Sequence, residues 1–131
     1  MLALSLLTML FPNPVYVRVR RNQLRIRHVE SGTETTFQAD VPFSTERMLI
    51  GEFSAAEHAL KSALKQAETG RYLRMPSQIL IHPLEMTDGG LSQIEERAFH
   101  EVAMGAGASK AFVWVGPELS DAEVKNKLNG K

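Results

Sequence analysis

Arginines at alternate positions form the set of residues whose spacing most clearly predicts a binding surface in this sequence. Arg18 and Arg20 alternate with valines in VYVRVR, and Arg25 and Arg27 alternate with apolar residues in LRIRHV. Alternate residues of a strand point to the same face, so a hairpin would bring these four side chains together, with Arg21 at its tip. These five arginines are the candidate interaction patch.

Three kinds of surface fit this patch. It can be a solvated face that glutamates of the same chain neutralise, a surface for an anionic protein, or a surface for nucleic acid. The glutamates available to neutralise it are Glu30, Glu34 and Glu46. Nucleic acid is the least favoured of the three, because the patch has almost no aromatic residues on which bases could stack.

No set of catalytic, cofactor-binding or metal-binding residues is predicted. The histidines share no metal-ligand spacing and are expected to be surface or hydrogen-bonded core residues; they are His28, His58, His82 and His100. A two-metal nuclease needs converging carboxylates, one of them on the first strand. That strand has none, and Asp40, Glu85 and Asp88 are scattered over a strand end and a loop.

Length and charge place few limits on function. The 131 residues suit a single domain, residues 1–131, with an apolar segment at 1–14 and a polar tail at 120–131. Fifteen basic residues balance fifteen acidic ones, so there is no global attraction to nucleic acid or anionic lipid. The absence of cysteine suits the reducing cytoplasm.

The apolar residues 1–11 are too few to cross a bilayer, which takes about 20 residues. We expect them to pack on the domain, to mediate self-association, or to make weak contact with a membrane. The expected location is therefore the cytoplasm, either free or peripheral at the inner membrane.

The hydrophobic pattern predicts a chain of alternating element types. Three antiparallel strands are expected at 15–19, 24–29 and 33–41. Ser54 with Glu57, and Ser92 with Glu95, have the spacing of capping boxes and predict the starts of two helices. The first helix is expected to end at Gly70. Each helix is expected to bury one apolar stripe: Ala56, Ala59, Leu60, Ala63, Leu64 and Ala67 in the first, and Ile94, Ala98, Val102 and Ala106 in the second. Further strands are expected at 78–82 and 111–115.

The order strand–strand–strand–helix–strand–helix–strand predicts an α/β fold with a mixed sheet. The strand at 78–82 should lie centrally and run parallel to the first and the last strand, since the helices are crossover connections. A meander followed by such a run is the ribonuclease H-like order, on which actin-like ATPases are built.

One segment carries a more specific resemblance. Residues 92–117, SQIEERAFHEVAMGAGASKAFVWVGP, resemble without a gap the part of MreB, the bacterial actin homologue, that runs from a helix through a Gly-Ala-Gly-Ala turn into a strand. The matching positions are Gln93, Glu95, Arg97, Ala98, Glu101, Ala103, Gly105, Ala106, Gly107, Ala108, Phe112 and Pro117. The resemblance implies the N-terminal-lobe-like part of a rod shape-determining, actin-like ATPase, without the second lobe.

The residues that differ from that family decide the chemistry expected here. Actin-like ATPases hold the nucleotide phosphates and Mg²⁺ with an Asp-x-Gly-Thr hairpin, whereas residues 17–22 here read VRVRRN. The family's Glu-Glu-Pro after the last strand is replaced by Val115 and Gly116 before Pro117. The resemblance therefore implies a degenerate nucleotide site, no cofactor and no enzymatic activity.

We expect a non-catalytic, actin-like or MreB-like interaction module, a pseudo-ATPase linked to cell shape or to filament regulation. Its partner would be another protein or a second copy of itself. The alternative is a nucleic-acid-binding or enzymatic protein that uses the arginine-rich hairpin on a ribonuclease H-like scaffold.

Overall fold

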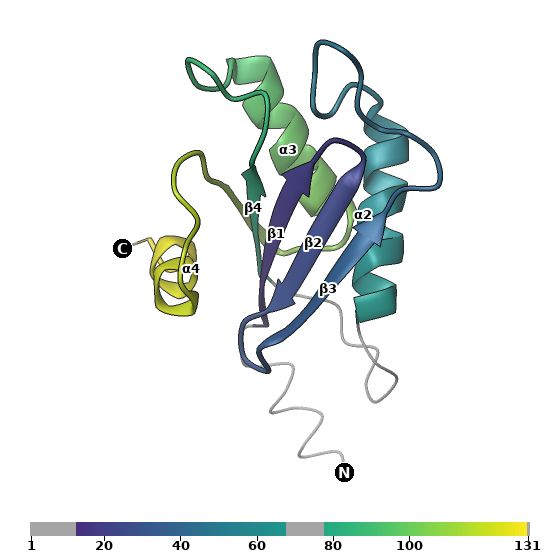
Figure 1. The fold of residues 1–131 in the computed structure, drawn as a ribbon. Helices are drawn as coiled ribbons and strands as arrows, with labels where there is room; N and C mark the ends of the chain where they lie inside the picture. Colours follow the sequence, from purple (N-terminus) through teal and green to yellow (C-terminus); the bar gives the residue numbers. More distant parts are fainter. Residues whose placement is uncertain (1–12, 68–77, 131) are drawn as a thin grey trace.

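The computed structural model describes residues 13–67 and 78–130, which form one five-stranded sheet with three helices (Figure 1). The strands are β1 (Pro14–Arg20), β2 (Gln23–His28), β3 (Thr33–Gln38), β4 (Gln78–Pro83) and β5 (Lys110–Val113). The helices are α2 (Phe53–Ala67), α3 (Gln93–Gly105) and α4 (Asp121–Leu128). The predictions for residues 1–11 and for Gly70 fall outside the described residues.

The sheet is mixed, and its strand order is β3-β2-β1-β4-β5. Strand β1 is antiparallel to β2, which is antiparallel to β3, whereas β4 is parallel to both β1 and β5. Val17 thus lies between Ile26 on one side and Ile81 on the other. The predicted parallel pairing of the strand at 78–82 with the first and last strands is confirmed.

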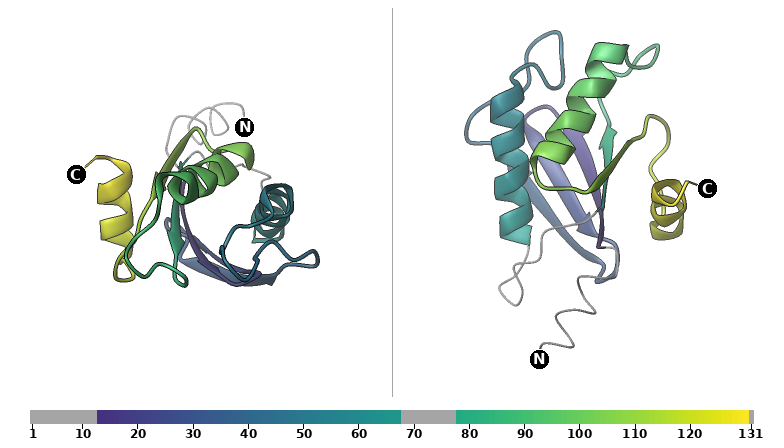
Figure 2. Two further views of the ribbon diagram at one scale, coloured as in Figure 1. Left: turned by 90° about the horizontal axis from the view of Figure 1, so that it is seen from above. Right: turned by 180° about the vertical axis from the view of Figure 1, so that it is seen from behind.

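Helices cover both faces of the sheet, as Figure 2 shows, with α2 and α3 on one face and α4 on the other. The larger core lies beneath α2 and α3. Helix α2 contributes the predicted apolar stripe to it: Ala56, Ala59, Leu60, Ala63, Leu64 and Ala67. The sheet contributes the side chains of Val15, Val17, Val19, Leu24, Ile26, Ile79 and Ile81.

A smaller core lies beneath α4. Its buried members are Tyr16, Val29, Leu80, Val124 and Leu128. Because both faces of β4 are covered, every residue from Ile79 to Pro83 is buried, as expected for a central strand. The polar tail predicted at 120–131 is therefore an ordered helix over most of its length, and it completes the fold.

Two predictions about the helices are wrong. Helix α2 begins at Phe53, so Ser54 lies inside its first turn and is not the N-cap. Ile94 was expected on the buried stripe of α3, but it is 76% exposed. The buried stripe of α3 is centred on Phe99 and Ala103, and Ile94 lies five residues before Phe99, about 140° around the helix axis.

The capping box predicted at the start of α3 is confirmed. The backbone N–H of Glu95 donates to Ser92 Oγ at 3.1 Å, and the backbone N–H of Ser92 donates to Glu95 Oε1 at 2.9 Å. Two otherwise unpaired backbone donors of the first turn are thereby satisfied, which explains why α3 begins at Gln93.

Candidate interaction surface on the sheet

Three of the five predicted arginines come together on the face of the sheet that α4 covers in part. Arg18 pairs in register with Arg25, and Tyr16 pairs in register with Arg27, so these side chains share one face. Helix α4 contacts β1, β4 and β5, and β2, which carries Arg25 and Arg27, pairs with β1. We call Tyr16, Arg18, Arg25 and Arg27 the arginine face.

Arg18 is the buried member of the arginine face, and its side chain is 10% exposed. It pairs with Glu34 of β3, and its Nη1 donates to Glu118 Oε1 at 2.9 Å. Its guanidinium also lies 5.0 Å from the centre of the Tyr16 ring. The hydrogen bond from Arg18 holds the pKa of the Glu118 carboxyl below its usual value. A buried cation is tolerated here because two carboxylates and an aromatic ring surround it.

Glu34 connects the arginines to one another. Besides Arg18 it pairs with Arg25, whose Nη2 lies 3.2 Å from Glu34 Oε2, and with Arg27, whose Nη1 lies 3.9 Å from Glu34 Oε1. Glu34 is one of the three glutamates expected to balance the patch. Glu30, the second, pairs instead with Lys125 of α4 at 2.9 Å.

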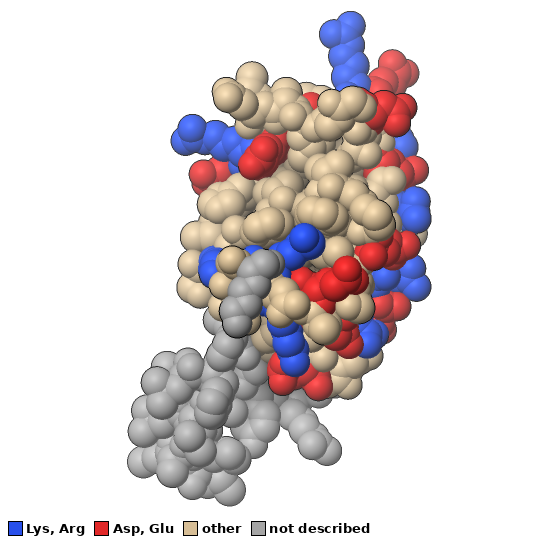
Figure 3. Space-filling model, turned by 90° about the vertical axis from the view of Figure 1, so that its left-hand side faces the viewer, with Lys and Arg blue, Asp and Glu red and all other residues tan. Residues whose placement is uncertain are grey.

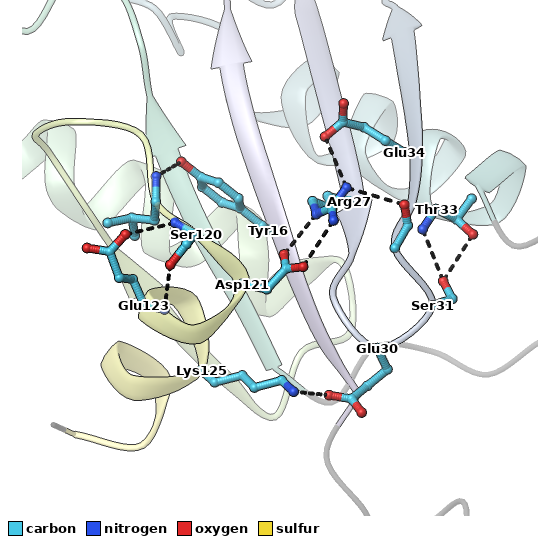
Figure 4. A network of polar contacts seen from close by, with 12 residues as sticks. Tyr16, Arg27, Glu30, Ser31, Thr33, Glu34, Ser120, Asp121, Glu123 and Lys125 are labelled. Atoms are coloured by element: carbon cyan, nitrogen blue, oxygen red, sulfur yellow. Dashed lines mark hydrogen bonds and ion pairs between the residues drawn. The ribbon is translucent and has the colours of Figure 1, made fainter.

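Arg27 connects β2 to the start of α4 (Figure 4). Its Nε donates to Asp121 Oδ1 at 2.8 Å and its Nη2 donates to Asp121 Oδ2 at 3.0 Å. This two-point contact lowers the pKa of the Asp121 carboxyl and raises the pKa of the Arg27 guanidinium. The planar guanidinium fixes the direction as well as the distance of the carboxylate.

The remaining two arginines of the predicted patch do not join this cluster. Arg20 is exposed at the end of β1 and forms no ion pair with any described residue. Arg21 lies at the hairpin tip, where its backbone N–H donates to Glu85 Oε1 at 2.6 Å and its side chain contacts Met86. The patch therefore divides into a paired group on the sheet and an exposed end.

A buried hydrogen-bonded chain lies next to Arg18. Tyr16 Oη lies 2.7 Å from His82 Nδ1 and accepts from the backbone N–H of Leu119 at 3.1 Å, while His82 Nε2 lies 2.8 Å from the Gly116 carbonyl oxygen. A carbonyl can only accept, so His82 carries its proton on Nε2, and its Nδ1 accepts a hydrogen bond from the Tyr16 hydroxyl. These hydrogen bonds attach the connection between β5 and α4 to the sheet.

Burial favours the neutral forms of both titratable groups in this hydrogen-bonded series, the Tyr16 hydroxyl and the His82 imidazole. It raises the pKa of the Tyr16 hydroxyl and lowers the pKa of the His82 imidazole. His82 is fully buried and both of its ring nitrogens are paired, as expected for a hydrogen-bonded core histidine. Its role is therefore to position the β5–α4 connection.

Helix α4 has further contacts at both ends. Ser120 and Glu123 form a capping box: the Glu123 N–H donates to Ser120 Oγ at 3.2 Å, and the Ser120 N–H donates to Glu123 Oε1 at 2.9 Å. Lys127 Nζ lies 3.9 Å from the centre of the Trp114 ring. Trp114 Nε1 donates to the Pro117 carbonyl at 2.9 Å. Polar contacts thus surround the small apolar core beneath the helix.

Sequence comparison finds similarity to an uncharacterized protein. The chain is 39% identical over 97 residues to the uncharacterized protein YjaA of Escherichia coli (strain K12), a match that covers 70% of this chain and 75% of YjaA. No family model matches the sequence. The chain belongs to the family of YjaA.

The surface of this YjaA-family chain carries mixed charge near α4. Figure 3 shows basic and acidic side chains interspersed on the side of the molecule that carries α4. No helix within residues 13–67 and 78–130 is long and apolar enough to cross a membrane. The same residues contain no group of three or more histidine or acidic side chains arranged to hold a metal ion.

Most of the MreB-like positions lie in and just after α3, on the face of the sheet opposite α4, whereas Phe112 packs against the core beneath α4. Glu95 belongs to the capping box, and Arg97 is exposed on α3. Gly105 is the last residue of α3, and Gly107 has a φ of 113°, a backbone conformation that favours glycine after the end of a helix. Pro117 follows β5 and accepts the hydrogen bond from Trp114.

Sequence reasoning missed the partners of the arginines in the second half of this YjaA-family chain, Glu118 and Asp121. It also assigned no contact to Tyr16, and it predicted His82 to be a surface or hydrogen-bonded core histidine without naming its partners. A usable signal was present, because Ser120 and Glu123 have the same capping-box spacing as Ser92 and Glu95. That spacing predicts a helix with two carboxylates near its start.

Proposed function

We propose that this chain is a non-catalytic interaction module on a ribonuclease H-like scaffold related to the N-terminal lobe of actin-like proteins. The sheet order and strand directions support the scaffold, because β2 alone runs against the other four strands and helices connect the parallel ones. The MreB-like segment at 92–117 gives the proposal its more specific form.

The main support for a non-catalytic role is that backbone N–H groups of the β1–β2 turn are already hydrogen-bonded within the protein. Phosphate binding by a hairpin of this kind requires free backbone N–H groups that point at the ligand. Here the N–H of Arg21 donates to Glu85 at 2.6 Å, and the N–H of Asn22 donates to Ser44 Oγ at 3.1 Å. The donors that would hold a phosphate are engaged, and the carboxylate of Glu85 would repel one.

A second feature keeps this turn in place. Asn22 has a φ of 54°, and its side-chain Oδ1 accepts from the backbone N–H groups of Phe43 and Ser44 at 2.9 and 2.8 Å. The turn is thereby bonded to the segment after β3, and Phe43 beside it is fully buried. Opening the turn to a nucleotide would break these bonds, which supports a structural role for it.

The arginine face supports protein recognition more than nucleic-acid recognition. Arg18, Arg25 and Arg27 all form ion pairs with carboxylates of the chain itself, so little uncompensated charge is left for a phosphate backbone. Carboxylates are also the groups that these guanidinium side chains already hold. The alternative of nucleic-acid binding has no comparable supporting contact.

Nucleotide assays test the non-catalytic part of the proposal. We expect calorimetry with ATP and Mg²⁺ near millimolar concentration to show no binding, and a phosphate-release assay to show no turnover above buffer. An active actin-like ATPase measured in parallel is the positive control. Micromolar binding of MgATP that is lost on Arg21→Ala substitution, or turnover above buffer, would overturn the proposal.

Cosedimentation tests the filament part. If the module acts on MreB-like filaments, the chain should pellet with polymerised MreB of its own host and stay in the supernatant with unpolymerised MreB. Retention in the supernatant under both conditions would overturn the link to filaments and leave the non-catalytic assignment to the nucleotide assays.

A further inference from the structure

Helix α4 is attached to the sheet by two apolar side chains and a set of polar contacts. Only Val124 and Leu128 of this helix are buried, whereas α2 buries six side chains over its length. The other contacts of the segment are the ion pairs of Glu118, Asp121 and Lys125 and the bond between Leu119 N–H and Tyr16. Exposed ion pairs stabilise little and are screened by salt, so α4 is the most easily displaced helix of the three described.

The surface beneath α4 has its own chemical character. Without α4, Arg18 would lose Glu118 and Arg27 would lose Asp121, which leaves the three arginines of the arginine face with Glu34 as their shared carboxylate. Tyr16 and Leu80, now buried beneath the helix, would become an exposed apolar centre. The result is an apolar strip beside a basic one.

The segment that lies on this surface has the complementary pattern. Glu118 and Asp121, three residues apart, meet the arginines at the start of α4. Val124 and Leu128, four residues apart, fill the apolar strip at its end. This is the spacing by which an amphipathic helix fits a groove, with carboxylates at the helix N-terminus where they are also favoured by the helix dipole.

We infer that α4 occupies in cis a site that binds an acidic amphipathic helix of a partner protein in trans. The inference rests on the proposed role as an interaction module and names the chemistry of its partner. The partner helix carries two carboxylates in and just before its first turn and two apolar residues one turn apart near its end. Binding requires α4 to leave the face, so partner and α4 compete for it.

The connection from β5 to α4 fits such an exchange. It includes Gly116, whose φ is 150°, followed by Pro117. Residues 116–119 are attached to the sheet by hydrogen bonds to His82 and Tyr16, and no residue of this connection is buried. The connection can rotate away when these bonds break, and among residues 116–119 the apolar side chain that would leave the small core is that of Leu119, which is only partly buried.

The test uses the full chain with α4 released, together with a labelled peptide that has the sequence of residues 117–130. Val124→Asp places a charge in the apolar strip, and the double substitution Glu118→Lys with Asp121→Lys repels α4 from the arginines. Each variant is first checked by circular dichroism for an intact sheet. Two independent variants keep the test decisive if one of them fails to fold.

We expect the peptide to bind both released variants and to bind the wild-type chain more weakly, because α4 competes there. A peptide with Glu118→Lys and Asp121→Lys should bind on the order of tenfold more weakly or not at all. Trp114 is the chain's single tryptophan and the peptide has none, so its emission reports the binding directly. Raising the salt concentration should weaken binding of the acidic peptide.

Absence of binding to a released variant that remains folded would overturn the inference, as would equal binding of the acidic and the lysine-substituted peptides. A wild-type dimer that disappears on Val124→Asp substitution would place the helix of a second copy on the face and overturn the assignment to a different protein. Failure of the peptide to bind while MgATP also fails to bind would leave the non-catalytic proposal intact.

Discussion

Arg27 and Asp121 are 94 positions apart in the sequence and form a two-point ion pair, with Nε 2.8 Å from Oδ1 and Nη2 3.0 Å from Oδ2. The pair joins the second strand to the first residue of the last helix. Because Asp121 also lies in the first turn of α4, its charge acts on the arginine and on the helix dipole together. The docking of α4 should therefore depend on this one carboxylate.

Replacing Asp121 by Asn should loosen α4 without unfolding the sheet. The change removes the charge from a contact that geometry makes specific, and we expect a measurable shift in Trp114 emission and a lower midpoint of thermal unfolding. The difference from wild type should shrink as salt is added, because ions screen the pair in the wild-type chain. Asp88→Asn, in an exposed loop, is the matched control and should change neither quantity.

The stability of the protein should fall as the pH drops below about 6.5, the ordinary pKa of histidine. Burial lowers the pKa of His82 in the folded chain, so the unfolded chain binds a proton more readily. The stabilisation is therefore complete above that pH and is lost as the pH falls towards the folded-state pKa. Urea unfolding followed at neutral and mildly acidic pH measures it.

His82→Gln should reduce this pH dependence, while His58→Gln, at an exposed position of α2, should leave it unchanged. Equal pH dependence in wild type and His82→Gln would show that another group is responsible. At still lower pH, protonation of Glu118 and Asp121 should weaken α4 further, since their pKa values are lowered in the folded chain and that stabilisation is lost as they are protonated.

The two capping boxes of the structure, at Ser92 and Ser120, offer a matched pair of substitutions. Ser120→Ala and Ser92→Ala each remove one N-cap hydroxyl, and each should cost roughly 1 kcal/mol of unfolding free energy. Only Ser120→Ala should change Trp114 emission in the native state, because Lys127 of α4 lies against that ring. A native-state change of the same size in Ser92→Ala would contradict the view that α4 moves independently.

The two glycines of the MreB-like turn should respond differently to alanine. Gly107 has a φ of 113°, so Gly107→Ala should destabilise by roughly 1–2 kcal/mol through backbone strain. At Gly105 a Cβ would meet only the flexible end of Glu57, and alanine favours the helix, so Gly105→Ala should be close to neutral. Chemical denaturation of both variants measures the difference.

The sequence predicted the sheet better than it predicted the contacts on its surface. Period-two alternation in β1 and β2 and the apolar run in β4 sufficed for the strand order, because each pattern is local and strong. The placement of Arg18, Arg25 and Arg27 on one face followed from the same alternation. Their partners did not follow, since Glu118 and Asp121 meet them only through the tertiary fold.

The errors on the helices have a common cause. Ser54 and Glu57 have capping spacing, but the backbone N–H of Ala56 donates to the Glu52 carbonyl at 3.0 Å, so the first helical turn closes before Ser54 could cap it. Ile94 was assigned to the core because it is apolar, although Phe99 and Ala103 define a different face of α3. In both cases the residue type alone does not fix the position, because the buried face and the first turn of the helix depend on the whole element.

The parallel pairing of β1 with β4 has a consequence for how the protein folds. Tyr16 and His82 touch across these neighbouring strands although 66 positions separate them, so the centre of the sheet cannot close until β4 has arrived. Until then β1 is an edge strand with the apolar side chains of Val15, Val17 and Val19 on one face and an unpaired backbone along the edge that β4 will cover, which is the usual template for aggregation. Shortened chains that end before residue 78 should therefore be prone to insoluble association, and β4 acts as the strand that protects its neighbour.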